Sequence, residues 1–236
     1  MLSSSPPKMN CKYITIDTET TGLSAGCPDL PLSIAGVVMD GNGRVIEAAD
    51  FLILPPRCRA SPFCVGWPTR SEFHRVGGAD AARHGVPFLL AIAEISRMAR
   101  SHDVEYVVAY NAKFDRGMIQ AWVRLTNIDP SLHEFLSLPW QCAYEQARRA
   151  LVKQATSFKL SHVYTLLFGD EEELDWHDAY ADAVAAGKVY ALLRARFDVS
   201  GTDRRTLVRI LCGAPTKKPG NPACRNMRGS CRYHAA

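Results

Sequence analysis

Three strand-like segments follow one another near the start of the chain before any helical pattern appears. The first, residues 12–17, alternates and is rich in β-branched and aromatic side chains, and the second, residues 32–39, is almost wholly apolar. The third covers residues 44–54, and the Asp-Gly-Asn-Gly turn signal at residues 40–43 lies between it and the second. The last two strands are therefore expected to form a hairpin.

Helical and strand-like segments alternate along the rest of the chain. Apolar side chains at helical spacing indicate a helix, and short continuous apolar runs indicate a strand. The expected helices cover residues 87–100, 113–126, 144–151, 159–167, 178–197 and 202–211. The further expected strands cover residues 105–110 and 140–143. Three strands followed by alternating helices and strands predict an α/β fold, a mixed five-stranded sheet flanked by helices.

Length and charge indicate one large domain, or a domain with a tail. The chain has 236 residues, of which 47% are hydrophobic and 22% charged, and these values exclude a wholly disordered or fibrous protein. From residue 203 onward there are eight Lys or Arg and one acid, whereas residues 1–202 carry 20 basic and 23 acidic side chains. A basic tail of this kind either binds nucleic acid or is a solvated terminus.

The lack of a secretory signal pattern and the number of cysteines predict a reducing compartment. Residues 1–10 lack the apolar core of a secretory signal, and no stretch reaches the roughly 18 apolar residues of a membrane helix. Eight cysteines in such a chain are expected to be reduced thiols, and we expect a cytoplasmic or nuclear location. The spacing of Cys212, Cys224, Cys231 and His234 matches no established zinc pattern, so free thiols are favoured there.

Two carboxylates end the first strand. Alternate side chains of a strand share a face, so Asp17 and Glu19 project together while Ile14 and Ile16 face the other way. Adjacent carboxylates repel each other, and a divalent ion such as Mg²⁺, which prefers oxygen ligands, resolves that conflict. A chain of this composition contains about 0.6 such pairs by chance. Taken alone, the pair is therefore a strand end that reaches solvent.

A second acidic motif opens the helix that follows the strand at residues 105–110. In one interpretation Asn111 caps this helix and Asp115 complements its dipole. In the other, Asp115 lies one turn into the helix and leans over the sheet edge, next to the end of a neighbouring strand.

A third motif opens the longest predicted helix. With Asp178 as the N-cap, Asp182 lies in the next turn and His177 stands just before the helix. The alternative is a plain helix N-terminus that is rich in acids.

Together the three motifs resemble the DEDDh 3′→5′ exonuclease family, of the proofreading-subunit type, which has a ribonuclease H-like fold. Asp17-Thr-Glu19-Thr-Thr-Gly-Leu matches the first family motif, residues 111–115 match N-x-x-F-D, and residues 177–182 match H-x-A-x-x-D. A histidine five residues before the last aspartate, in place of a tyrosine four before it, indicates the histidine subclass. The resemblance covers roughly residues 12–197, and Tyr110 stands where the family frequently has histidine.

The resemblance implies a two-metal hydrolysis of phosphodiester bonds. By this likeness Asp17 bridges two Mg²⁺ ions, and Glu19 and Asp182 hold the ion that activates water. Asp115 holds the second ion through water, and His177 takes the proton of the attacking water. Mn²⁺ is expected to substitute for Mg²⁺, and the product is a nucleoside 5′-monophosphate released from the 3′ end.

Substrate contacts are also expected from the resemblance. They fall on Thr18, Thr20, Thr21, Leu23, His74, Asn111 and Phe114. For Phe114 a place in the core is favoured over a contact with a base. The loop at residues 55–74 interleaves arginines with aromatic side chains, which suits a single strand, although its aromatics equally suit packing onto the body.

The predicted organisation is a flexible segment at residues 1–10, an exonuclease domain at residues 11–212 and a poorly ordered basic tail at residues 213–236. DNA is favoured over RNA as substrate. Two alternatives are an RNA-trimming exoribonuclease and a non-catalytic nucleic-acid-binding module on the same fold. The expected partner is a DNA or RNA 3′ end, with no membrane. Proofreading would require association with a polymerase, and the oligomeric state is left open.

Overall fold

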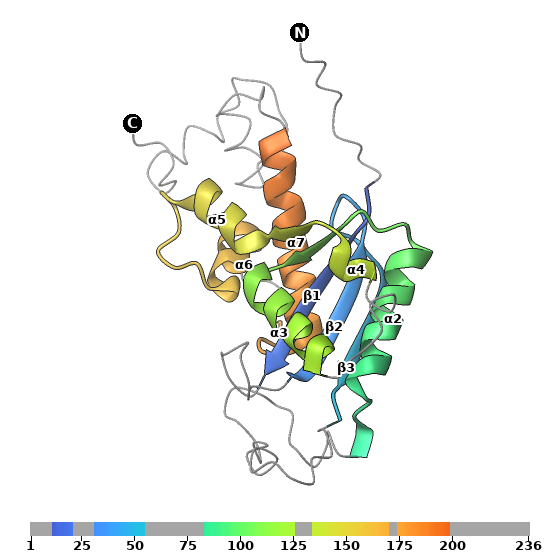
Figure 1. Ribbon diagram of the computed structural model, residues 1–236. Helices are drawn as coiled ribbons and strands as arrows, with labels where there is room; N and C mark the ends of the chain where they lie inside the picture. The colour runs from blue at the N-terminus through green and yellow to red at the C-terminus, as the bar shows by residue number, and fades with distance from the viewer. Residues whose placement is uncertain (1–10, 21–30, 55–82, 126–133, 170–173, 199–236) are drawn as a thin grey trace, which may run out of the picture. The chain divides into compact units, whose positions relative to one another are not determined.

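The strand β1 is the central strand of a mixed five-stranded sheet, which confirms the predicted α/β fold (Figure 1). The computed structural model describes residues 11–20, 31–54, 83–125, 134–169 and 174–198. The strands are β1 (Tyr13–Thr20), β2 (Pro31–Met39), β3 (Val45–Leu52), β4 (Tyr106–Ala109) and β5 (Trp140–Cys142). The helices are α2 (Phe88–Ser101), α3 (Ala112–Leu125), α4 (Glu134–Ser137), α5 (Ala143–Leu151), α6 (Leu160–Phe168) and α7 (Ala179–Asp198).

Strand directions place the carboxyl ends of three strands at one edge. The order is β3-β2-β1-β4-β5; β1 pairs antiparallel with β2, and β2 with β3, as the predicted hairpin requires. The strand β4 runs parallel to β1, and β5 parallel to β4. The chain therefore leaves β1, β4 and β5 at the same edge of the sheet, and α3 and α5 begin there.

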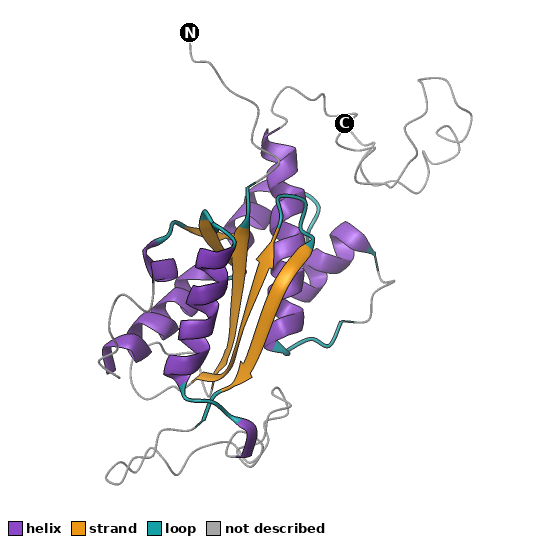
Figure 2. Ribbon diagram, turned by 90° about the vertical axis from the view of Figure 1, so that its right-hand side faces the viewer, coloured by secondary structure: helices purple, strands orange, loops and turns teal. Residues whose placement is uncertain are grey.

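The alternation of β1 divides its side chains between two cores. Ile14 and Ile16 pack in a cluster with α2 and α3, whereas Tyr13 packs on the opposite face with α7. All nine residues of β2 are buried, which explains its continuous apolar pattern, and the edge strand β3 is only partly buried. Figure 2 shows the resulting layers, with helices on both sides of the sheet.

A close approach brings α7 onto the sheet. A Cβ atom added to Gly187 would lie 2.6 Å from the hydroxyl oxygen of Thr15 and would overlap the sulfur of Met39. The hydroxyl of Tyr13 donates to the carbonyl of Gly187 at 3.0 Å. Glycine at this position therefore sets how closely the helix that carries Asp182 packs against β1 and β2.

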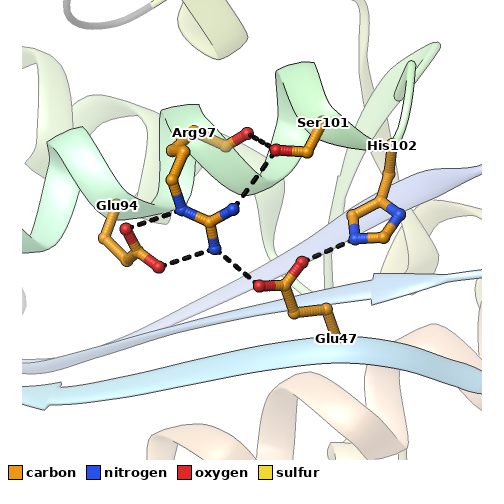
Figure 3. A network of polar contacts seen from close by, with 5 residues as sticks. All are labelled: Glu47, Glu94, Arg97, Ser101 and His102. Atoms are coloured by element: carbon orange, nitrogen blue, oxygen red, sulfur yellow. Dashed lines mark hydrogen bonds and ion pairs between the residues drawn. The ribbon is translucent and has the colours of Figure 1, made fainter.

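A surface network joins β3 to α2 (Figure 3). The guanidinium of Arg97 donates to Glu47 at 2.6 Å and to Glu94 at 2.7 and 2.9 Å, and Glu47 also pairs with His102 at 2.5 Å. Hydrogen bonds from Arg97, and then from His102, lower the pKa of Glu47. Arg97 is exposed and the other charged groups are partly exposed, so solvent screens these pairs and they contribute little to stability.

Some expectations differ from the structure, and others lie outside its described residues. The first strand continues past the predicted end at Asp17 to Thr20, because β1 pairs with β2 over its whole length. The short helix α4 was not predicted. The expected helix at residues 202–211, the loop at residues 55–74 and the basic tail lie outside the described residues. Within the described part of the chain, no helix combines the length and the apolar character needed to cross a membrane.

The chain divides into two units, Met1–Arg194 and Ala195–Ala236. The site and the surface described below lie within the first unit.

Candidate active site

The end of β1 brings Asp17 and Glu19 to the face of the sheet that α7 covers. They lie two and four residues beyond Thr15, which is in the close approach to Gly187 of α7. The prediction that they project away from Ile14 and Ile16 is therefore confirmed. The β1–β2 register shifts between Glu19 and Thr20, so regular pairing ends beside the carboxylates.

The first turn of α3 brings Asp115 against β1. Asp115 is only 3% exposed, and one of its oxygens accepts hydrogen bonds from the hydroxyl of Thr18 at 2.8 Å and from the Thr18 backbone N–H at 3.1 Å. The second interpretation of this motif, a carboxylate that leans over the sheet edge toward a neighbouring strand, is therefore correct.

The start of α7 supplies the third motif. Asp178 is the N-cap, because its side chain accepts a hydrogen bond from the backbone N–H of Ala181 at 2.9 Å. His177 precedes it with a φ of 68°, a left-handed conformation that costs a non-glycine residue energy. Ligand atoms of Glu19, His177 and Asp182 all lie within 4.8 Å of one another. Residues from the two ends of the domain sequence thus meet in one cluster.

Burial raises the pKa of all four carboxyl groups. Burial, and then the charges of Asp115 and Asp182, hold the pKa of Asp17 well above its usual range. Burial, and then Asp182, raise the pKa of Glu19 to about 8. The pKa of Asp115 rises to about 7 because burial outweighs the hydrogen bonds from Thr18. That of Asp182 rises to about 6 because burial outweighs the opposing effect of His177.

The residues present fit a divalent cation. The donors are carboxylate oxygens, which Mg²⁺ prefers, and they repel one another in a partly desolvated place. One buried oxygen of Asp182, Oδ1, accepts no hydrogen bond from the described residues. Buried polar atoms normally have a hydrogen-bond partner. A bound cation would give this oxygen a partner and would reduce the repulsion between the carboxylates.

The predicted substrate contacts have different outcomes. Thr18 directs its hydroxyl to Asp115, and Phe114 packs against the apolar cluster under α3, in agreement with the core alternative. Asn111 is exposed at the start of α3 and Thr20 is buried at the end of β1, and their contact with substrate stays a prediction. The other expected contacts, Thr21, Leu23 and His74, lie outside the described residues.

One acid near the site was missed by sequence reasoning. In the sheet, Asp17 pairs with Ala35 and Ala35 pairs with Asp50, which places Asp50 on the same face as Asp17 two strands away. The Asp50 residue is exposed overall, but partial burial of its carboxyl group, and then the charge of Asp178, raise its pKa. The hairpin signal was visible in the sequence, but only its exact register aligns Asp50 with Asp17.

Comparisons with known proteins agree with this geometry. The exonuclease family RNase_T matches residues 14–190. No curated protein sequence matches the chain.

Solved structures share the fold. Product-bound exonuclease I is 20% identical with a TM-score of 0.56, over 80% of this chain and 45% of that one. Exonuclease I of E. coli in complex with a 5cy-dA13 oligonucleotide is also 20% identical, with a TM-score of 0.55, over 84% of this chain and 42% of that one. The nuclease domain of 3′hExo, a DEDDh family member bound to rAMP, is 12% identical with a TM-score of 0.59, over 83% of this chain and 96% of that one.

The likeness to these structures shows the fold, and the chain spans less than half of the length of exonuclease I. The family match covers most of the chain, including all three motifs. The resemblance inferred from those motifs is thus confirmed, and the chain belongs to the exonuclease family.

Proposed function

We propose that this protein is a divalent-metal-dependent 3′→5′ exonuclease that releases nucleoside 5′-monophosphates from nucleic-acid 3′ ends, with DNA favoured over RNA. One observation carries the proposal: four carboxyl groups with raised pKa values meet at the end of β1, next to an exposed histidine. A binding module has no need for carboxylates held in such an unfavourable arrangement.

Asp17, Glu19, Asp115 and Asp182 would hold two Mg²⁺ ions, for which Mn²⁺ substitutes. When bound, such ions lower the pKa of water and compensate the negative charge that develops on the phosphodiester. The protein contributes oxygen donors that are already gathered and partly desolvated, so little reorganisation is needed.

His177 is the proposed general base. It accepts a proton from water while the water oxygen attacks phosphorus, the bond from phosphorus to the 3′ oxygen breaks, and the departing 3′ oxygen takes a proton from solvent. The products are a nucleoside 5′-monophosphate and a strand with a new 3′ hydroxyl. Histidine is suited to accept and release protons near neutral pH, and the exposure of His177 lets it return its proton to solvent.

The neighbours suggest the substrate class. An E. coli exonuclease I structure holds a deoxyoligonucleotide, whereas the 3′hExo structure holds rAMP. Both support a nucleic-acid 3′ end as substrate, so DNA and RNA must be compared directly. A role in proofreading would add a polymerase as partner.

The test uses single-stranded DNA and RNA of one sequence, labelled at the 5′ end. We expect a ladder that shortens from the 3′ end with Mg²⁺ or Mn²⁺, and that disappears with chelator or with Asp17→Ala. Faster shortening of RNA would overturn the DNA preference and favour the exoribonuclease alternative. Tight binding of both strands without shortening would overturn the exonuclease proposal in favour of the binding module.

A further inference from the structure

A cluster of aromatic side chains lies next to the carboxylates at the same sheet edge. Thr15 pairs with Val108 in the parallel β1–β4 ladder, so Asp17 and Tyr110 each lie two residues further along neighbouring segments. Tyr110 packs in the cluster under α7, which places it on the same face as Asp17. The backbone N–H of Tyr144 donates to the Tyr110 carbonyl at 2.9 Å, which holds the start of α5 at this edge.

The cluster extends outward from Tyr110. The ring of Tyr144 lies edge-on to those of Tyr110 and Phe158, with centroids 5.9 and 6.3 Å away, and the hydroxyl of Tyr110 donates to the Phe158 carbonyl at 2.6 Å. The guanidinium of Arg148 lies 5.7 Å from the centroid of Tyr144, over its ring. Tyr144 and Phe158 are both partly exposed, whereas Arg148 is exposed.

The segment that carries Tyr144 and Phe158 is the most basic part of the described chain. Residues 143–169 contain four Lys or Arg and one acid. The four basic side chains are all exposed: Arg148, Arg149, Lys153 and Lys159. The site beside them is strongly acidic, so a polyanionic strand that reaches it needs positive charge close by.

We propose that Tyr144, Arg148, Phe158 and Lys159, named here the α5–α6 surface, bind the single strand on the 5′ side of the nucleotide that is removed. This inference rests on the proposed exonuclease function and deepens it. The basic side chains attract phosphates, and the aromatic rings offer faces on which bases stack without regard to sequence. The charge of the surface, opposite to that of the strand, identifies single-stranded nucleic acid as its occupant.

The electrostatic test reverses charge on this surface with the double variant Arg148→Glu/Lys159→Glu. The matched control is Arg124→Glu, an exposed side chain in the last turn of α3, roughly 20 Å along that helix from its start at the sheet edge. The substrates are a 12-nucleotide strand and a dinucleotide. We expect the double variant to lower kcat/KM for the 12-nucleotide strand about tenfold or more at low salt, and that for the dinucleotide less than about twofold.

Binding is measured separately from cleavage, by fluorescence anisotropy of the 12-nucleotide strand in chelator. The double variant should weaken binding and reduce the slope of log affinity against log salt by about 0.7 for each phosphate that the surface no longer neutralises. Tyr144→Leu should weaken binding about fivefold or more, while Tyr144→Phe, which keeps the ring, should bind as the wild type does. Thermal unfolding shows whether Tyr144→Leu is folded. If it is not folded, the comparison of the double variant with Arg124→Glu decides the test.

The outcomes separate this inference from the proposed function. If the wild type cleaves, and the double variant and the Arg124→Glu control behave alike on the 12-nucleotide strand, the surface assignment is overturned and the exonuclease proposal stands. If the wild type binds without cleaving and the double variant loses binding, the surface is supported and the exonuclease proposal falls. A wild type that neither binds nor cleaves overturns both.

Discussion

Thr18 donates two hydrogen bonds to the same oxygen of Asp115, from its hydroxyl at 2.8 Å and from its backbone N–H at 3.1 Å. They join the central strand to the first turn of α3, and both partners are buried. Both bonds favour the ionised carboxylate and oppose the rise in the pKa of Asp115 that burial causes. Thr18 therefore supports a carboxylate proposed to hold metal.

Replacing Thr18 by valine tests this support, since Thr18→Val removes the hydroxyl and keeps the shape and the backbone N–H. The variant should weaken Mn²⁺ binding in calorimetry, raise the Mg²⁺ concentration needed for half-maximal activity and lower the free energy of unfolding by about 1–3 kcal/mol. Thr18→Ser, which restores a hydroxyl, should recover most of the affinity. Equal Mn²⁺ affinity in the valine variant and the wild type would contradict the assignment.

Replacing His177 tests the general base. His177→Asn is better suited than alanine, because asparagine tolerates the left-handed conformation at φ 68°. We expect kcat to fall about 10²–10⁴-fold while Mn²⁺ affinity changes little. Because His177 also lies within 4.8 Å of Glu19 and Asp182, a parallel loss of Mn²⁺ affinity would show that it is a metal ligand.

The carboxyl cluster predicts an inverse dependence of stability on pH without metal. The folded-state pKa values of Glu19, Asp115 and Asp182 are about 8, 7 and 6, above the value of about 4 in unfolded chains. The folded state thus binds more protons than the unfolded state between about pH 4 and 8, so the free energy of unfolding falls as pH rises through that range.

Thermal unfolding in chelator at pH 5 and pH 8 checks this dependence. The midpoint should be lower at pH 8, by about 2–4 °C for each kcal/mol lost, and Mg²⁺ should raise it more at pH 8 than at pH 5. Glu19→Gln removes one of the titrating groups and should reduce the fall. A fall as large in Glu19→Gln as in the wild type would show that the dependence arises elsewhere.

A fourth prediction concerns the close packing of α7 against the sheet at Gly187. Alanine normally favours a helix over glycine by about 1 kcal/mol. At Gly187 the added methyl group would meet Thr15 and Met39, so Gly187→Ala should lower the free energy of unfolding by about 1–3 kcal/mol. It should also reduce kcat, because Asp182 lies on the same helix. A Gly187→Ala variant as stable as the wild type would contradict the close packing.

The sequence predicted the local parts of the site well. The alternation of β1 placed Asp17 and Glu19 on one face, and the hypothesis that Asp178 is the N-cap of α7 is confirmed. Each depends on the period of one element or on contacts within a few residues, which a sequence displays directly. The end of β1 was predicted too early, because pairing with β2 extends the strand to Thr20.

What the sequence alone determined was the order of the main elements and the identity of the acids in the three motifs, since period and motif spacing are properties of the chain itself. Only the tertiary structure decided which groups touch. It joined Thr18 to Asp115 across 97 residues, aligned Asp50 with Asp17 through the hairpin register, and brought Tyr144 to the edge where the carboxylates lie. Contacts between distant segments depend on strand register and on how closely helices pack, and both are set by the whole core.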